Sequence, residues 1–247
     1  MVLKTKKHQP NELSILVLRD GFSFCTQKKS CFYPIEDSNN IDSKAISDFL
    51  DQEELVSETV SLIHLDGLSS IVPLELFEKE NAAFYLSKGL TLAPNQQVVF
   101  DVLESYNQAV VYPRDVKKWN VLKELFPTLE AKHATTTVLA PLTDFSMGTP
   151  KKQLFVHLRE GAFELFLFQG AQLLFFNSFE YFLLRYLTDA FVKVTTADAS
   201  RKHNRSIKII ILCKKEFRLM RDDVINSSGQ RARISKIKGT LVTLFTI

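Results

Sequence analysis

The sequence predicts an α/β protein built from two related subdomains, and three observations lead to this prediction. Short strand patterns alternate with helical patterns along the 247 residues. A stretch rich in turn residues, Phe145 to Lys152, interrupts them past the middle of the chain. The strand pattern that opens the chain then returns. We therefore predict a first subdomain over residues 1–147 and a second, shorter one over residues 148–247.

The composition is that of an ordinary globular protein. Apolar residues make up 45% and charged residues 24%, which excludes disordered, collagen-like and coiled-coil classes. Phenylalanine is abundant, with 20 Phe against 6 Tyr, and such rings mostly fill cores. The net charge of +3 is too small to predict nucleic acid as a partner. Basic residues gather at 201–221 and 231–238, either as a solvated face or as a binding patch for an acidic partner.

The sequence favours a cytoplasmic location. Met1 to Pro10 is polar and lacks the apolar region of a secretory signal. Polar residues interrupt the apolar stretch Gly161 to Leu187, so no membrane span is predicted. Cys25, Cys31 and Cys213 match neither a zinc nor a redox spacing, which indicates buried free thiols in a reducing compartment.

The first half opens with a predicted meander of three strands. Asp20-Gly21 separates the apolar runs Glu12 to Arg19 and Phe22 to Gln27, and an Asp-Gly pair in this position is a strong hairpin signal. Cys31 to Ile35 is the third strand. Further predicted elements are a helix over Ile41 to Leu50, a strand over Glu58 to Leu65, a mostly helical stretch over Ser70 to Ser87, strands over Gln97 to Glu104 and Ala109 to Tyr112 (the second ended by Pro113), a helix over Val116 to Phe126, and a short strand over Leu129 to His133. Thr135 to Phe145 fits either a strand or a helix.

The second half begins in the same way. Strands are predicted over Gln153 to Arg159, Ala162 to Phe168 and Gln172 to Phe176. Asn177 and Glu180 stand at capping positions before a helical stripe that runs to Phe191. A strand over Ser206 to Cys213, a helix over Lys215 to Val224, and strands over Ala232 to Ile237 and Thr240 to Thr246 complete it. Phe175 and Phe176 must point to opposite faces of their strand, so either one is exposed or the sheet is covered on both sides.

A short internal repeat links the two halves. Leu18-Arg19-Asp20-Gly21 matches Leu158-Arg159-Glu160-Gly161, and each tetrapeptide ends the first strand of a meander that a helix follows. The shared order of elements favours duplication over chance. Two such subdomains facing each other would enclose a cleft, where ligands usually bind.

Three segments carry a resemblance to a known family: ELSILVLRDGFSF, IVPLELFEKENAAFYL and LLFFNSFEY. They resemble an uncharacterised family of Bacteroidetes proteins, over nearly the whole chain. The resemblance implies an actin-like fold, that of the sugar kinase, Hsp70 and actin superfamily, in which two ribonuclease-H-like subdomains of mixed sheet are flanked by helices. It brings no biochemical function with it.

The resemblance also implies where a nucleotide would bind. ATP-hydrolysing members of the superfamily carry an Asp-x-Gly-Ser/Thr loop at the first hairpin, an Asp-x-Gly loop at the second and a late Gly-Gly motif. Their glycines let backbone N–H groups approach phosphates, and their carboxylates hold Mg²⁺. This chain has Asp20-Gly21-Phe22-Ser23 and Glu160-Gly161, and it has no Gly-Gly pair. Asp20, Gly21, Ser23, Glu160 and Gly161 are therefore candidates for a vestigial phosphate site.

The other polar residues do not form a pattern typical of a catalytic or metal site. Asp20 and Glu160 are either Mg²⁺ ligands or ordinary turn residues. His64, His133 and His157 share no metal-ligand spacing, so no metal site is predicted and they are interpreted as structural. The chain contains none of the nucleophile-elbow, Walker or zinc-protease motifs.

These observations predict a non-catalytic interaction or scaffold protein with an unknown protein partner and no cofactor. The alternative is a nucleotide-binding or phosphotransfer enzyme that uses Asp20 and Glu160 with Mg-ATP in the cleft between the subdomains.

Overall fold

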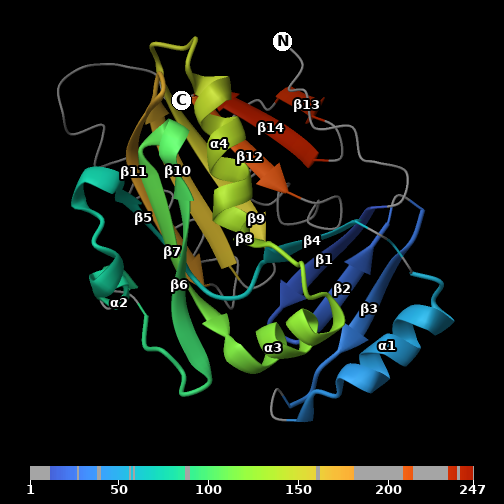
Figure 1. The fold of residues 1–247 in the computed structure, drawn as a ribbon. Coiled ribbons are helices and arrows are strands. Elements are labelled where there is room, and N and C mark those ends of the chain that lie inside the picture. The colour runs from blue at the N-terminus through green and yellow to red at the C-terminus, as the bar shows by residue number, and fades with distance from the viewer. Residues whose placement is uncertain are drawn as a thin grey trace. The chain divides into compact units, whose positions relative to one another are not determined.

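The computed structural model describes residues 12–26, 28–37, 40–55, 57, 59–86, 90–159 and 162–180, together with the backbone of three strands at 208–213, 233–237 and 240–246. The chain forms two compact units, Met1–Ala140 and Pro141–Ile247. Helix α4 (Ala134–Ser146) runs from one unit into the other (Figure 1). This helix resolves the ambiguity of the threonine-rich segment.

The first unit is built on a five-stranded sheet that confirms the predicted meander. Strands β1 (Glu12–Leu18), β2 (Gly21–Cys25) and β3 (Ser30–Pro34) pair antiparallel. Strand β4 (Thr59–His64) lies parallel to β1, and β8 (Ala131–His133) lies parallel to β4. The strand order is therefore β3-β2-β1-β4-β8, which brings the carboxyl ends of β1, β4 and β8 to one edge.

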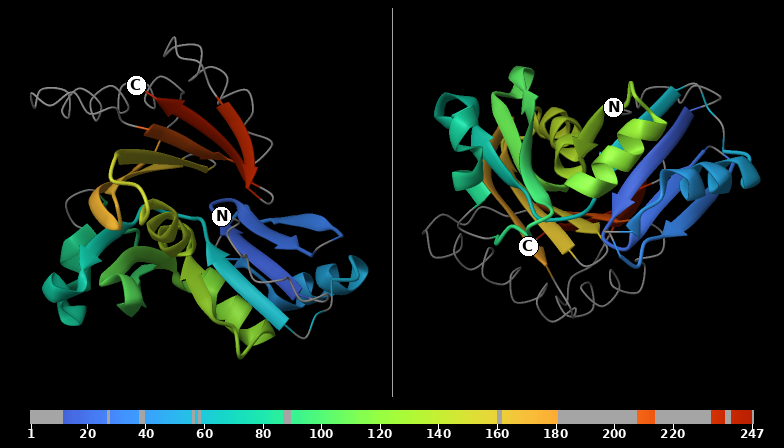
Figure 2. Two further views of the ribbon diagram at one scale, coloured as in Figure 1. Left: turned by 90° about the horizontal axis from the view of Figure 1, so that it is seen from above. Right: turned by 60° about the horizontal axis from the view of Figure 1, so that its bottom comes forward.

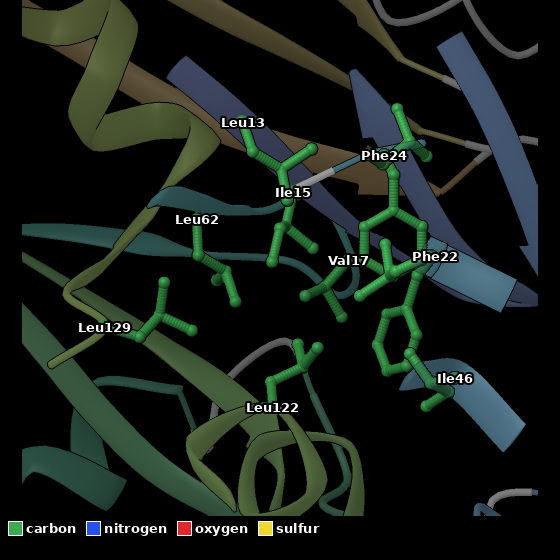
Figure 3. Close-up of a cluster of buried hydrophobic side chains, with 11 residues drawn as sticks. Leu13, Ile15, Val17, Phe22, Phe24, Ile46, Leu62, Leu122 and Leu129 are labelled. Carbon is green, nitrogen blue, oxygen red and sulfur yellow. The ribbon is translucent and has the colours of Figure 1, made fainter. Parts of the chain in front are cut away.

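Two helices cover one face of this sheet, α1 (Ser43–Gln52) and α3 (Val116–Leu125), as the left view of Figure 2 shows. Both confirm predicted helices, and an aspartate caps each one: Asp42 accepts from the Lys44 backbone and Asp115 from the Lys117 and Lys118 backbones. The strands turn alternate residues toward these helices. The buried cluster in Figure 3 consists of Leu13, Ile15, Val17, Phe22, Phe24, Ile46, Leu50, Leu55, Leu62, Leu122 and Leu129.

A smaller sheet is inserted in the chain between β4 and β8. Strands β5 (Ser70–Pro73), β7 (Gln108–Asp115) and β6 (Gln96–Leu103) pair antiparallel in the order β5-β7-β6. Two short 3₁₀ turns, η2 (Leu74–Leu76) and η3 (Lys79–Asn81), lead into the helix α2 (Ala82–Leu86). A third 3₁₀ turn, η4 (Glu104–Tyr106), joins β6 to β7.

Two predictions for this region need correction. The segment 70–87 is helical only from Leu74 onward, in two 3₁₀ turns and α2, because its first residues, Ser70–Pro73, pair with β7 as a strand. Pro113 does not end β7 but pairs with Val98 of β6. The proline is tolerated because β5 reaches only as far as Val111, so beyond that residue β7 has a neighbour on one side only.

The second unit is built on a six-stranded sheet in the order β11-β10-β9-β12-β14-β13. Strands β9 (Lys152–Arg159), β10 (Ala162–Gln169) and β11 (Gln172–Glu180) form the second predicted meander. Strand β12 (Lys208–Cys213) lies parallel to β9, while β14 (Thr240–Thr246) pairs antiparallel with both β12 and β13 (Arg233–Ile237).

The predicted helix start after the second meander was wrong. Asn177 and Glu180 belong to β11, where antiparallel pairing with β10 continues to the pair Ala162–Glu180. The rest of that predicted helix, and the one over 215–224, lie outside the described residues. Within β11, Phe176 packs against Phe166 with ring centres 4.9 Å apart, whereas Phe175 is 37% exposed.

The two large sheets repeat one topology, but the matching tetrapeptides are not equivalent in it. In both sheets a three-stranded meander is followed by a strand parallel to its first strand. The first hairpin closes at the pair Leu18–Gly21 and the second at Arg159–Ala162. The tetrapeptide match therefore lies one residue out of register with the pairing. Because strand side chains alternate, that offset exchanges the two faces.

Candidate functional site

The first hairpin holds Asp20, Gly21 and Ser23 at one end of the five-stranded sheet. Since Leu18 pairs with Gly21, the turn consists of Arg19 and Asp20, both exposed. Neither has a positive φ, so this is not the left-handed turn that an Asp-Gly pair favours. The Asp20 carbonyl accepts a 2.8 Å hydrogen bond from the Ile35 backbone, which ties the turn to the end of β3.

Gly21 is needed for the close approach of a neighbouring strand. A Cβ atom at this position would lie 2.2 Å from the Tyr33 carbonyl oxygen and 2.8 Å from the Phe32 ring. Real Cβ contacts are never this short, so only glycine fits between β2 and β3 here. The missing side chain makes room for β3 rather than for a phosphate.

The next two residues point to opposite faces of β2. Phe22 is completely buried in the core beside Phe24, with ring centres 6.1 Å apart (Figure 3). Ser23 lies on the other face, where its hydroxyl is 3.5 Å from the Cys25 sulfur. That sulfur also lies 3.2 Å from the Ser30 hydroxyl. Cys25 and Cys31 are free and half-buried, not fully buried as predicted.

The buried ammonium group of Lys118 lies next to the turn of the first hairpin. Lys118 Nζ donates to the carbonyls of Leu18 at 2.8 Å and Arg19 at 2.9 Å, and it lies 3.5 Å from Asp66 Oδ2. Its side chain is only 3% exposed. The group therefore stands at the carboxyl ends of the parallel strands β1 and β4, where open α/β sheets bind ligands. The turn directs carbonyl oxygens at a cation there, whereas a phosphate cradle requires N–H groups.

Lys118 and Asp66 were not predicted from the sequence, although one signal was present. Lys117 and Lys118 occupy the first turn of α3, where the helix dipole disfavours positive charge. A buried lysine in that position needs acceptors from elsewhere in the chain. Here the acceptors are the carbonyls of Leu18 and Arg19, which lie 100 and 99 positions earlier in the sequence.

His64 lies buried next to this lysine at the end of β4. Its ring is 5.8 Å from that of Tyr112 and 6.3 Å from that of Trp119. Burial, reinforced by Arg114 and Lys118, lowers the pKa of His64 to about 3. The imidazole is therefore neutral near pH 7, and its Nε2 atom has no hydrogen-bond partner within the described part of the chain.

Asp101 of β6 joins the inserted sheet to the start of α4. Its Oδ1 accepts from the Tyr112 hydroxyl at 3.0 Å, and its Oδ2 accepts from the His133 backbone at 2.8 Å and the Thr136 hydroxyl at 2.6 Å. The carboxylate thus lies at the amino terminus of α4, where negative charge is favoured. Burial and this carboxylate raise the pKa of Tyr112 far above its ordinary value. Both carboxylate oxygens of Asp101 accept hydrogen bonds from other residues of the chain, so we interpret this cluster as structural.

The second hairpin cannot be compared with the first at its turn, because Glu160 and Gly161 lie outside the described residues. Near the second hairpin turn, the fully buried Glu164 carboxylate contacts two ionisable side chains, Arg159 and His157. Its Oε1 lies 2.9 Å from Arg159 Nη2 and its Oε2 lies 2.8 Å from His157 Nδ1. This pairing neutralises the charge that burial would otherwise penalise.

Within the described ranges, no group of three or more His, Cys, Asp or Glu side chains is arranged to hold a metal ion. No helix in those ranges is both long enough and apolar enough to span a bilayer.

Comparison with solved structures identifies the fold. The structure resembles a Bacteroides thetaiotaomicron protein with an actin-like ATPase fold and unknown function, with a TM-score of 0.69, 18% identity and coverage of 92% of this chain and 91% of that one. It also resembles the PilM–PilN type IV pilus biogenesis complex, with a TM-score of 0.52, 10% identity and coverage of 89% and 86%. An exopolyphosphatase from Cytophaga hutchinsonii matches with a TM-score of 0.35, 11% identity and coverage of 89% and 72%. The predicted actin-like fold is thus confirmed.

Comparison of the sequence gives a family but no activity. A family model described as "Protein of unknown function (DUF3822)" matches residues 2–183. None of the curated proteins compared matches the chain.

Proposed function

The chain belongs to the DUF3822 family of proteins of unknown function, and we propose that it is a non-catalytic interaction protein, an actin-like scaffold with degenerate nucleotide loops. One observation carries this proposal, namely the Lys118 ammonium beneath the first hairpin. It donates to the carbonyls of Leu18 and Arg19 and pairs with Asp66. A Mg²⁺ ion at the same place would meet a fixed positive charge a few ångströms away.

The residues around the turn support the same proposal. Phe22 is fully buried in the core, and Gly21 lies too close to β3 to carry a side chain. The backbone of both residues is therefore fixed within β2 and cannot adjust to a phosphate. Asp20 keeps an exposed side chain, but within the described residues it belongs to no group of three or more His, Cys, Asp or Glu side chains that could hold a metal ion.

A structural neighbour supports an interaction role by analogy of fold. The PilM–PilN structure is a complex of two different proteins, so an actin-like fold of this kind can serve assembly. Analogy of fold is a weaker support than the site itself.

Titration with Mg·ATP tests the proposal against the nucleotide-binding alternative. We expect no heat of binding in calorimetry and no shift of the unfolding temperature. Since a ligand present at 100 times its Kd stabilises a protein by about 2.7 kcal/mol, millimolar Mg·ATP would reveal any binding in the micromolar range.

The variant Asp20→Asn provides the matched control, because the Asp20 side chain is exposed and its loss leaves the core intact. Submillimolar binding by the parent protein that disappears in this variant would overturn the proposal in favour of the nucleotide-binding alternative. Binding that persists in the variant would also contradict degenerate loops, because it would reveal a nucleotide site elsewhere.

A further inference from the structure

Strand β6 forms one edge of the inserted sheet, in which the strand order is β5-β7-β6 (Figure 1). Its eight residues pair with β7 without a register shift, from the pair Gln96–Asp115 to the pair Leu103–Gln108. Within the described part of the chain, no strand pairs with the other side of β6. That side therefore offers a row of backbone N–H and C=O groups to a further strand.

The other edge strands of the described sheets carry features that discourage such pairing. Strand β8 has three residues and β5 has four. Strands β3 and β5 end in Pro34 and Pro73, β11 contains a bulge, and β13 contains Arg233 and Lys236. Natural proteins protect sheet edges with short strands, prolines, bulges and basic side chains. Strand β6 has none of these features, since its sequence QQVVFDVL holds no proline, lysine or arginine.

One face of β6 carries an apolar row that is only partly covered. Val98, Phe100 and Val102 alternate along the strand and therefore share a face. Val98 and Phe100 are half-buried, whereas Val102 is 46% exposed. The first two pack against the buried cluster of Val72, Ala82, Leu86 and Val111. A strand added beside β6 would cover the exposed side of this row with its own side chains.

The apolar row is symmetric about Phe100, because one valine stands two residues before it and another stands two residues after it. Two antiparallel copies of β6, related by a twofold axis at Phe100, would place Phe100 opposite itself and Val98 opposite Val102. Apolar side chains then meet on one face, which is the kind of cross-strand pair that stabilises a sheet. Strand β6 is thus complementary to a second copy of itself.

The charges near the row are compatible with this pairing. Asp101 is the only charged residue of β6, and in the twofold arrangement it lies opposite Val99 rather than opposite a second carboxylate. Both of its carboxylate oxygens already accept hydrogen bonds from other residues of the chain. Lys79, whose ammonium lies 5.8 Å from the Phe100 ring centre, is exposed, so its charge stays in contact with water.

We propose that the chain forms a homodimer in which the two copies of β6 pair antiparallel about Phe100. The two inserted sheets then join into one continuous sheet. Because each copy contributes the same strand, the interface is closed and does not extend into a filament. This inference goes beyond the proposed function and does not depend on whether the chain binds nucleotide.

Sedimentation velocity of the full chain tests the dimer, at concentrations from about 1 to about 300 μM because a small interface binds weakly. The parent protein should change from monomer to dimer within this range. Val102→Lys introduces a charge at a side chain that is already exposed, and it should weaken dimerisation at least about tenfold.

Phe175→Lys is the matched control, because it makes the same kind of change at a 37% exposed residue of another edge strand, β11. It should leave the dimer unchanged. Circular dichroism should show that both variants keep the fold of the parent, since both substituted side chains are exposed.

Cross-linking tests the register of the pairing. In the double variant Val98→Cys, Val102→Cys, each new cysteine lies opposite one of the other copy, with Cα atoms about 4.5–5.5 Å apart, which is within the range of disulfides. Oxidation with copper phenanthroline should therefore link the two chains covalently. Each single variant places its cysteine opposite a valine and, like the parent with its own cysteines, should give no covalent dimer.

Any of four results would overturn the inference. These are a monomer at every concentration, a dimer that Val102→Lys leaves intact, a dimer that Phe175→Lys weakens to the same extent, and no covalent dimer from the double cysteine variant. The Mg·ATP titration is scored separately, so failure of the dimer and failure of the non-catalytic function are distinguishable.

Discussion

Lys118 combines a structural role with a consequence for function. A buried ammonium is costly unless acceptors replace its lost hydration, and here two carbonyls and Asp66 do so. The same contacts hold the first hairpin turn against α3.

Lys118→Met should destabilise the protein by about 3–5 kcal/mol, because two inward carbonyls and a carboxylate lose their cation. Urea unfolding measures the change. Lys117→Met is the matched control: this neighbour is exposed, and we expect a change within about 0.5 kcal/mol. Equal effects of the two substitutions would contradict the assigned role.

His64 should make stability depend on pH. Its pKa is 6.5 when unfolded and about 3 when folded, so between these values the unfolded chain binds the extra proton. Stability should therefore fall as the pH drops from about 6.5 toward 3, with a contribution of about 1.4 kcal/mol per pH unit. His64→Phe should flatten the curve of unfolding free energy against pH by that amount. Parallel curves for variant and parent would refute it.

Gly21→Ala should destabilise the protein by about 1–3 kcal/mol, because the new methyl group collides with the Tyr33 carbonyl and β3 must move. Gly148→Ala is a suitable control, since nothing lies within 4 Å of its added Cβ and its φ is not positive. Thermal unfolding of both variants measures the difference. A Gly21 variant as stable as the Gly148 variant would show that β3 can give way freely.

At the scale of elements, the Asp101 carboxylate connects the inserted sheet with α4, the helix that begins directly after β8 of the five-stranded sheet. The carboxylate on β6 accepts from the His133 backbone, directly before α4, and from the Thr136 hydroxyl in the first turn of that helix.

Asp101→Asn keeps the shape but places an NH₂ group among donors. We expect a loss of about 1–3 kcal/mol and faster amide exchange in β6 and β7 than in β1 and β2. Hydrogen exchange followed by mass spectrometry resolves the two sheets. Glu104→Gln, on the exposed turn after β6, should leave exchange unchanged. Uniform acceleration across both sheets would argue against a local fastening.

Elements with strong local signals could be predicted from the sequence. The hairpin of β1 and β2, the helices α1 and α3, and the meander of β9 to β11 follow from strand alternation, turn residues and helical spacing. Prediction failed where a distant strand competes with the local pattern. Ser70–Pro73 pairs with β7, and Asn177–Glu180 pairs with β10 in spite of its capping residues.

The residues of the candidate site likewise divide into those that a local signal predicts and those that depend on distant contacts. The positions of Asp20, Gly21 and Ser23 on one hairpin were predictable from a dipeptide. Lys118 and Asp66 were not, because the contacts that define their role join segments far apart in the sequence. The proposed phosphate-loop role of Glu160 and Gly161 stays a prediction.

At the scale of the whole molecule, the first unit contains the five-stranded and the inserted sheet, the second unit contains the six-stranded sheet, and each unit has its own buried side chains. We expect a core substitution to act within its unit. Phe166→Ala removes a fully buried ring from β10 and should cost about 3–5 kcal/mol.

In that variant amide exchange should accelerate in β9 to β11 and stay unchanged in β1 to β4. Phe24→Ala should give the opposite distribution, since its ring lies in the core of the first unit. Hydrogen exchange checks both variants side by side. Acceleration of both sheets by either substitution would mean that the units unfold as one.

The register of the two hairpins has a practical consequence for building chimaeras. A graft of the β9–β10 hairpin onto the first sheet would naturally be spliced at the shared tetrapeptide. That junction would exchange the two faces of the graft, because the paired ends Leu18–Gly21 and Arg159–Ala162 differ from the sequence match by one residue. The splice must follow the hydrogen-bond ladder, and sequence identity at the junction is a misleading guide to it.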